Sequence, residues 1–225
     1  RKLIKSKKST IIIPVGSLEQ HGAHLPITTD SDIVTEIASR LAKKCGFIVL
    51  PTISYGVSFE HEPLFNTSIS PKKFADFLSD IIYSLISNHI ISIIILNGHH
   101  GNTRFIEQLE NSFLRPQTPG MKETRAFQQA RMSAFKLGLK VRSYSYWRYM
   151  KHEFDHAGFV ETSLMLAISD KVRMKKAKKG LIMENLSKLE QSAAKKLSTE
   201  RAGFPKVAKN GVWGDPIGAT KNDGK

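Results

Sequence analysis

The stretch TIIIPVGSLEQHGAHLPITTD, residues 10–30, joins an apolar run to a dense cluster of polar side chains. Residues 10–15 are almost entirely apolar, which is typical of a strand buried in an open α/β sheet. Within the next fifteen residues the chain places Glu19, His21, His24 and Asp30. Ligands of open parallel sheets bind beyond the carboxyl ends of the strands, so this cluster predicts a metal site there.

The spacing of these residues indicates how they reach one cation. Glu19 and His21 are two residues apart, so at the end of a strand they share a face and Gln20 points away. Asp30 precedes a predicted helix, residues 32–44, which carries apolar residues at helical spacing. The alternative role for Asp30, or for Ser31, is to cap that helix.

A second polar cluster follows another apolar run, in ISIIILNGHHGN, residues 91–102. His99 and His100 come directly after residues 90–96, which form a predicted buried strand. Gly98 and Gly101 permit a tight turn that returns His99 toward the sheet edge. Because both clusters follow parallel strands, we expect them to converge.

A third cluster lies in HAGFVETSLML, residues 156–166, where His156 and Glu161 are five residues apart. Glu161 opens a predicted buried helix, so its alternative role is that of a first-turn carboxylate favoured by the helix dipole. Together the imidazoles and carboxylates suit zinc, manganese or iron, and they can hold two ions if one carboxylate bridges. Water activated by two cations is a hydrolytic nucleophile.

Strands and helices alternate along the chain, which predicts a parallel sheet. Further elements are a strand at 47–53, a helix at 71–87, a helix after Asn102 and a strand-like stretch at 140–147. The helix at 71–87 begins with Ser70 as a cap and Pro71 at the first position. Its expected apolar face consists of Phe74, Phe77, Leu78, Ile81 and Leu85.

Length and composition bound the class of protein. The 225 residues have ordinary apolar content and fit one domain, residues 1–225, with a sizeable core. The single cysteine, Cys45, excludes an internal disulfide and a cysteine-rich zinc site. No apolar run is long enough to cross a membrane, and we expect a soluble cytoplasmic protein with no membrane partner.

The net charge is +14 and the sequence pI is about 9.9. Such basicity raises the alternative of a nucleic-acid-binding protein, but no helix-turn-helix, zinc-finger or ribonucleoprotein motif supports nucleic acid as a partner. The same charge favours an anionic small-molecule substrate, for example a phosphorylated one. Much of the excess lies in lysine runs such as residues 171–180, which are typical of solvated surfaces.

Four separated blocks, PVGSLEQHGAHLPITTD, NGHHGN, HAGFVETSLML and GVWGDPIGAT, together resemble the creatininase (creatinine amidohydrolase) family, in the family's order. The resemblance implies a three-layer α/β/α fold with a mostly parallel central sheet. It also implies a hydrolase of C–N amide-type bonds that binds two divalent metal ions (Fe²⁺, Zn²⁺ or Mn²⁺) and assembles as a homo-oligomer.

The resemblance also implies roles for individual residues. Glu19 and His99 would bind one metal, His21 the other, and Asp30 would bridge both. His156 would transfer a proton. Glu161 would complete the shell of the second metal or act as acid or base, and the spacing leaves both roles open.

The substrate implied by the resemblance depends on the form of the second block. Members that open creatinine carry a glutamate after the second-cluster histidine, where this chain has His100 and Gly101. The NGHxGN form is instead similar to deformylases of a formamidopyrimidine ribonucleotide in riboflavin and deazaflavin biosynthesis, and to mycofactocin-precursor peptidases. The expected substrate-binding residues are His61, His100, Asn102 and Trp147. For His61 the alternative is a solvated polar residue, and for Trp147 it is packing.

Overall fold

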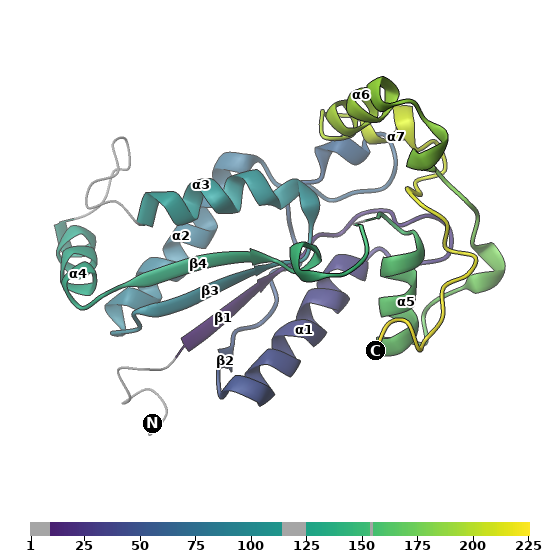
Figure 1. Cartoon of the computed structure of the whole chain (residues 1–225). Coiled ribbons are helices and arrows are strands. Elements are labelled where there is room, and N and C mark those ends of the chain that lie inside the picture. The colour runs from purple at the N-terminus through teal and green to yellow at the C-terminus, as the bar shows by residue number, and fades with distance from the viewer. Residues whose placement is uncertain (1–9, 114–124, 154) are drawn as a thin grey trace.

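The computed structural model describes residues 10–113, 125–153 and 155–225. Four parallel strands form one sheet in the order β2-β1-β3-β4: β1 (Thr10–Val15), β2 (Ile48–Val49), β3 (Ser92–Asn97) and β4 (Lys140–Ser145). Helix α1 (Thr29–Cys45) covers one face, and α2 (Pro71–Ser87) and α3 (Thr103–Phe113) cover the other (Figure 1). The predicted three-layer α/β/α architecture with a parallel sheet is confirmed.

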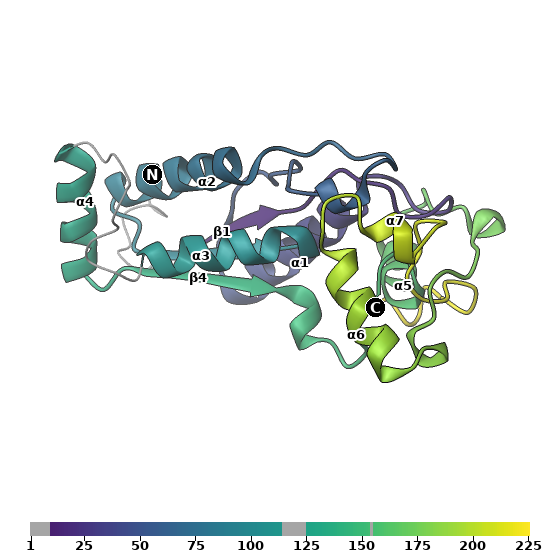
Figure 2. The same cartoon turned by 90° about the horizontal axis from the view of Figure 1, so that it is seen from above.

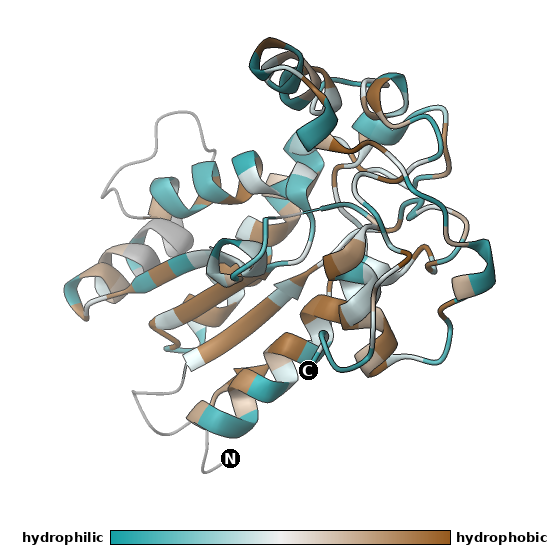
Figure 3. Cartoon of the chain, turned by 45° about the vertical axis from the view of Figure 1, so that its right-hand side comes forward, coloured by the Kyte–Doolittle hydropathy of each residue, from teal (hydrophilic) through white to brown (hydrophobic). Residues whose placement is uncertain are grey.

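The core follows from the alternation of side chains along the central strands. In β1, Ile11 and Ile13 face the layer of α2 and α3, whereas Ile12 packs with Val34 and Ala38 of α1. These three isoleucines are 5%, 0% and 0% exposed in order of residue number, so both faces of the strand are closed to water. The central strands β1 and β3 are accordingly coloured mostly brown, as hydrophobic, in Figure 3.

Strand β2 is shorter than the predicted strand at 47–53. Pairing with β1 continues through Leu50 N to Ile12 O at 2.9 Å and resumes at an isolated bridge between Val15 and Ile53. Between them stands Pro51, which has no N–H to donate and interrupts the ladder. This edge position tolerates the break because no strand pairs on its other side in the described sheet.

Two expectations about helices are wrong. Helix α1 begins at Thr29 with Thr28 as the N-cap residue, so neither Asp30 nor Ser31 caps it. Helix α2 has its predicted bounds, but Ser70 makes no side-chain capping bond and Phe77 is 49% exposed. The buried stripe of α2 is rotated toward residues such as Leu78 and Ile82, because α3 and the sheet lie on that side.

The remaining helices lie at the two ends of the sheet. Helix α4 (Arg125–Lys136) lies near the amino ends of the strands, while α5 (Phe159–Ile168), α6 (Lys188–Ser198) and α7 (Phe204–Val207) lie beyond the carboxyl ends (Figure 2). Short 3₁₀ turns occupy Phe59–His61, His100–Asn102, Tyr146–Tyr149, Met174–Lys176 and Met183–Asn185. None of the helices in the described ranges combines the length and apolar character that a membrane crossing requires.

Candidate metal centre

The three clusters converge beyond the carboxyl ends of β1 and β3. Glu19 and His21 lie in the loop after β1, and His99 follows β3. Asp30 comes from the first turn of α1, and Glu161 comes from the first turn of α5. All five residues are buried, and none is more than 3% exposed.

One group of ligands consists of Glu19, Asp30 and His99. His99 Nδ1 lies 3.3 Å from Glu19 Oε1 and 3.0 Å from Asp30 Oδ2. Ser17 Oγ donates to the other oxygen of Glu19 at 3.1 Å. This hydrogen bond orients Glu19 so that Oε1 faces the imidazole.

The second group consists of His21, Asp30 and Glu161. His21 Nε2 lies 3.2 Å from Asp30 Oδ1 and 3.4 Å from Glu161 Oε2. Asp30 therefore directs one oxygen at each group, which is the arrangement of a bridging carboxylate. The structure brings together the residues that were expected to share each metal, with Glu161 beside His21 and Asp30, and their roles as ligands stay predictions.

These residues fit two divalent cations on the chemistry of their donor atoms. Glu19 Oε1, Asp30 Oδ2 and Glu161 Oε1 are buried and make no hydrogen bond of acceptable geometry. Buried carboxylate oxygens are costly unless a cation or a donor compensates them. Mixed imidazole and carboxylate groups suit zinc, manganese and iron, so cations would satisfy these oxygens.

Electrostatics couple the two groups. Burial lowers the pKa of His21, but Asp30 and Glu161 outweigh it and raise the pKa to about 10. Burial raises the pKa of Glu161 to about 8. Burial lowers the pKa of His99, and Glu19 and Asp30 raise it well above its usual value. Because metal ligands must be deprotonated, a cation that binds these side chains would have to displace protons from them.

His156, the expected proton-transfer residue, lies beside both groups. Its ring centroid is 4.2 Å from that of His21, and its Nδ1 is 3.9 Å from Glu19 Oε1. Burial lowers the pKa of His156 well below its usual value, and the neighbouring His21 and His61 lower it further. A neutral ring can accept a proton at this position.

Gln20 was expected to point away from the site. Its side chain instead enters the histidine cluster. Its Nε2 lies 3.0 Å from His61 Nδ1 and 3.2 Å from His156 Nε2. Its Oε1 accepts from Gly22 N at 3.0 Å, which fixes the orientation of the amide. The alternation rule fails here because β1 ends at Val15 and Gln20 belongs to a loop.

The GVWGDP block holds this arrangement through its backbone. His156 N donates to Trp213 O at 3.0 Å, and Trp213 N donates to His156 O at 2.8 Å. Gly211 has φ +75°, and a Cβ at this position would overlap Gln20 Oε1. The block thus fixes His156 and leaves room for Gln20.

Asp155 is a further residue that the sequence analysis missed. Its Oδ2 accepts from Val160 N at 2.8 Å and its Oδ1 from Glu161 N at 3.3 Å, so it binds the free N–H groups at the start of α5. Burial raises the pKa of Asp155 to about 6. Because Glu161 lies in this first turn, Asp155 fixes the backbone that presents it. The signal in the sequence was an aspartate shortly before a helix start.

His61 is not a solvated residue, since it is only 2% exposed. Its Nε2 lies 3.0 Å from Glu19 Oε1, and the neighbouring Glu60 approaches His99 Nε2 at 3.3 Å. Phe204 of α7 packs against the His61 ring, with centroids 4.5 Å apart. The turn Phe59–His61 therefore forms a wall of the metal centre, and His61, which the family resemblance implied as a substrate-binding residue, lies in it.

The other expected substrate-binding residues differ in their surroundings. His100 is exposed, and its ring lies 5.9 Å from that of half-buried Trp147. Their contact with substrate stays a prediction. Asn102 is fully buried, and its amide binds Val57 N at 2.9 Å and Gly16 O at 3.0 Å. These bonds give Asn102 a role in joining loops, and its contact with substrate stays a prediction.

A sequence profile of the creatininase family, described as creatinine amidohydrolase, matches residues 1–225. The mycofactocin precursor peptide peptidase of Mycobacterium ulcerans is 29% identical over 228 residues, covering 96% of this chain and 78% of the relative. The creatinine amidohydrolase of Pseudomonas putida is 27% identical over 181 residues, covering 70% of this chain and 64% of the relative.

A third relative is the 2-amino-5-formylamino-6-ribosylaminopyrimidin-4(3H)-one 5'-monophosphate deformylase of Methanosphaera stadtmanae. It is 36% identical over 118 residues, covering 48% of this chain and 47% of the relative. A solved creatininase variant described as the Zn–Zn type has the same fold, with a TM-score of 0.73 and 22% identity over 99% of this chain and 86% of that chain. On the profile match across its whole length, the chain belongs to the creatininase family.

Proposed function

We propose that this protein is a metal-dependent amidohydrolase that cleaves a C–N amide-type bond with the help of two divalent cations. The observation that carries the proposal is Asp30, whose two oxygens face two separate groups of buried ligands. The family of the chain is one of amidohydrolases, which supports the same class of reaction. Zinc, manganese and iron all suit the ligands.

Bound cations would supply an activated water and polarise the carbonyl oxygen of the substrate. Hydrolysis also requires that a proton reach the leaving nitrogen. His156 is suited to this task because its Nε2 lies 3.0 Å from Gln20 O, while Nδ1 faces the ligand cluster. The backbone carbonyl of Gln20 and the backbone of Trp213 hold the ring in place. Glu161 binds metal in this scheme, and the acid or base role falls to His156.

For the substrate, we infer a formamide on a ribosylaminopyrimidine phosphate, which makes the protein a deformylase. The NGHHGN block and the deformylase relative support this inference. So does charge, since residues 171–209 hold twelve of the 34 Lys and Arg residues and only three of the 20 acidic residues. This segment carries Phe204, which packs on His61 and His156 beside the centre.

A peptidase acting on a modified peptide precursor is the second candidate. The mycofactocin peptidase relative aligns with nearly all of this chain, which favours it. Creatinine is less favoured as the substrate. Family members that open creatinine carry a glutamate where this chain has His100 and Gly101, and here a side chain at position 101 would overlap Glu60.

We also infer that the protein forms a homo-oligomer and lies in the cytoplasm. Exposed apolar side chains support an interface between copies: Phe77 on α2 is 49% exposed, and Phe135 on α4 is 43% exposed. Light scattering on the purified protein would measure the mass, and a monomer at micromolar concentration would contradict the inference.

The first experiment combines metal content with product release. Protein purified without oxygen would be loaded separately with iron, zinc or manganese and offered the formamidopyrimidine nucleotide. Two metals per chain with release of formate support the deformylase. Metal without formate, but with cleavage of a precursor peptide, favours the peptidase. A chain that binds no metal contradicts the amidohydrolase itself.

A further inference from the structure

His99 has two chemically different edges. On one edge, Nε2 lies 3.0 Å from Val57 O and 3.3 Å from Glu60 Oε1. A carbonyl oxygen only accepts hydrogen bonds, so Nε2 carries a hydrogen. In the neutral ring the lone pair then lies on Nδ1, which faces Glu19 and Asp30.

Gly101 is what allows the Glu60 carboxylate to reach this edge. A Cβ at position 101 would overlap Glu60 Oε1 and Val57 O and would lie 2.5 Å from His99 Nε2. The backbone here is fixed from both sides, since Asn102 binds Val57 N and Gly16 O. Glu60 therefore reaches His99 from a segment whose backbone is held by Asn102, and the absence of a side chain at Gly101 leaves room for its carboxylate.

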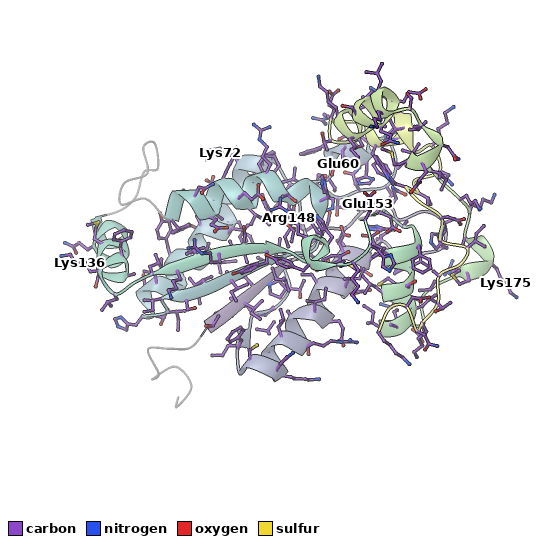
Figure 4. All side chains as sticks on the ribbon, viewed as in Figure 1. Glu60, Lys72, Lys136, Arg148, Glu153 and Lys175 are labelled. Atoms are coloured by element: carbon purple, nitrogen blue, oxygen red, sulfur yellow. The ribbon has the colours of Figure 1, made fainter. Side chains whose placement is uncertain are left out.

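Glu60 comes from a different element than the ligands that follow the strands. It lies on the turn Phe59–His61, next to α7 and close to α6, as Figure 4 shows. Its side chain is 13% exposed, whereas those of Glu19 and Asp30 are 0% and 3% exposed. A partly hydrated carboxylate does not bear the full cost of burial.

We propose that Glu60 is a positioning residue for the cation held by Glu19, Asp30 and His99. With Val57 O it accepts the hydrogen of His99 Nε2, which holds the ring plane. Its negative charge makes Nδ1 a more basic ligand, as carboxylates bonded to metal-binding histidines do. Val57 O already selects the tautomer, so the contribution of Glu60 is charge and orientation. The inference rests on the proposed metal centre.

The test measures binding of Co²⁺ to the full chain, by titration with visible absorbance and by metal content after dialysis. For Glu60→Gln we expect one of two Co²⁺ ions to bind about tenfold more weakly, and for Glu60→Ala about 10–100-fold. The absorption bands of that ion should shift, and the other ion should be unaffected. Glu62→Gln is the matched control, because Glu62 is in the same segment but binds exposed Arg201 instead.

A His99→Ala background tests whether Glu60 acts through His99. There we expect Glu60→Gln to change Co²⁺ affinity less than twofold, because the ring that transmits the effect is gone. An unchanged affinity of both Glu60 variants in the otherwise native chain would overturn the inference, as would equal weakening of both ions. Failure of the native chain itself to bind Co²⁺ would instead contradict the proposed function.

Discussion

Replacing Asp30 with asparagine tests the bridging role most directly. In the structure Asp30 Oδ1 lies 3.2 Å from His21 Nε2, and Oδ2 lies 3.0 Å from His99 Nδ1. Asparagine keeps the shape but turns one oxygen into an amide nitrogen, which has no lone pair to offer a cation. It also removes a negative charge that both ligand groups share. Both metal affinities should therefore fall together.

The size of the effect follows from the number of ligands lost. Loss of a residue that only supports a metal ligand costs about 10–100-fold in affinity, so loss of a direct ligand should cost at least about 100-fold for each ion. That is about 2.7 kcal/mol per ion, or about 5 kcal/mol for the two. In excess metal this lowers the melting temperature of a 225-residue chain by about 10–20 °C.

The assay is metal content after dialysis, with thermal unfolding in excess zinc and in chelator. Asp32→Asn is the control, because Asp32 lies in the same first turn of α1 but binds Thr28 Oγ1 and is 31% exposed. Replacing Asp32 removes the same favourable interaction with the helix dipole, about 0.3–1 kcal/mol, but no side chain that faces the metal centre. Loss of only one metal from Asp30→Asn, or full retention of both, would refute the bridge.

Three further outcomes are expected. His156→Ala should retain both metals while turnover falls about 10²–10⁴-fold, and unchanged turnover would remove its proton-transfer role. Gly211→Ala should cost about 1–3 kcal/mol of stability, because its φ is +75° and a Cβ would overlap a buried amide, whereas Gly218→Ala meets open space and should unfold like the native chain. In chelator, His21 and Glu161 have pKa values raised to about 10 and about 8, so the folded state binds more protons than the unfolded one. Chelated protein should therefore lose stability as pH rises from 6.5 to 10, and a melting temperature that rises across this range would contradict the assigned protonation.

Much of the metal centre could be predicted because each cluster follows a strand or opens a helix. Strands β1 and β3 are parallel and share a register from Thr10↔Ser92 to Val15↔Asn97. The segments that carry Glu19 and His99 therefore leave the sheet at the same edge. Asp30 follows from the start of α1, even though that start lies three residues earlier than predicted. These positions depend on periodicity, which the sequence contains.

What periodicity could not predict is which loop residues turn inward. Gln20 was expected to point away and His61 was weighed as a solvated residue, yet both contact the histidine cluster. Phe77 matched the apolar face of α2 but is exposed, because the neighbours of the helix decide which part of a broad stripe is covered. Loop side chains have no repeating pattern, so their direction depends on contacts distant in sequence.

The sequence alone determined the parallel α/β class, the ligand types and the order of the clusters, because strand and helix periods and donor chemistry are local properties. Only the tertiary structure decided that Asp30 divides its oxygens between two groups and that Glu60 reaches His99 beside Gly101. These contacts join segments up to 69 residues apart, as between Asp30 and His99. They exist only once burial of the strands has closed the chain around them.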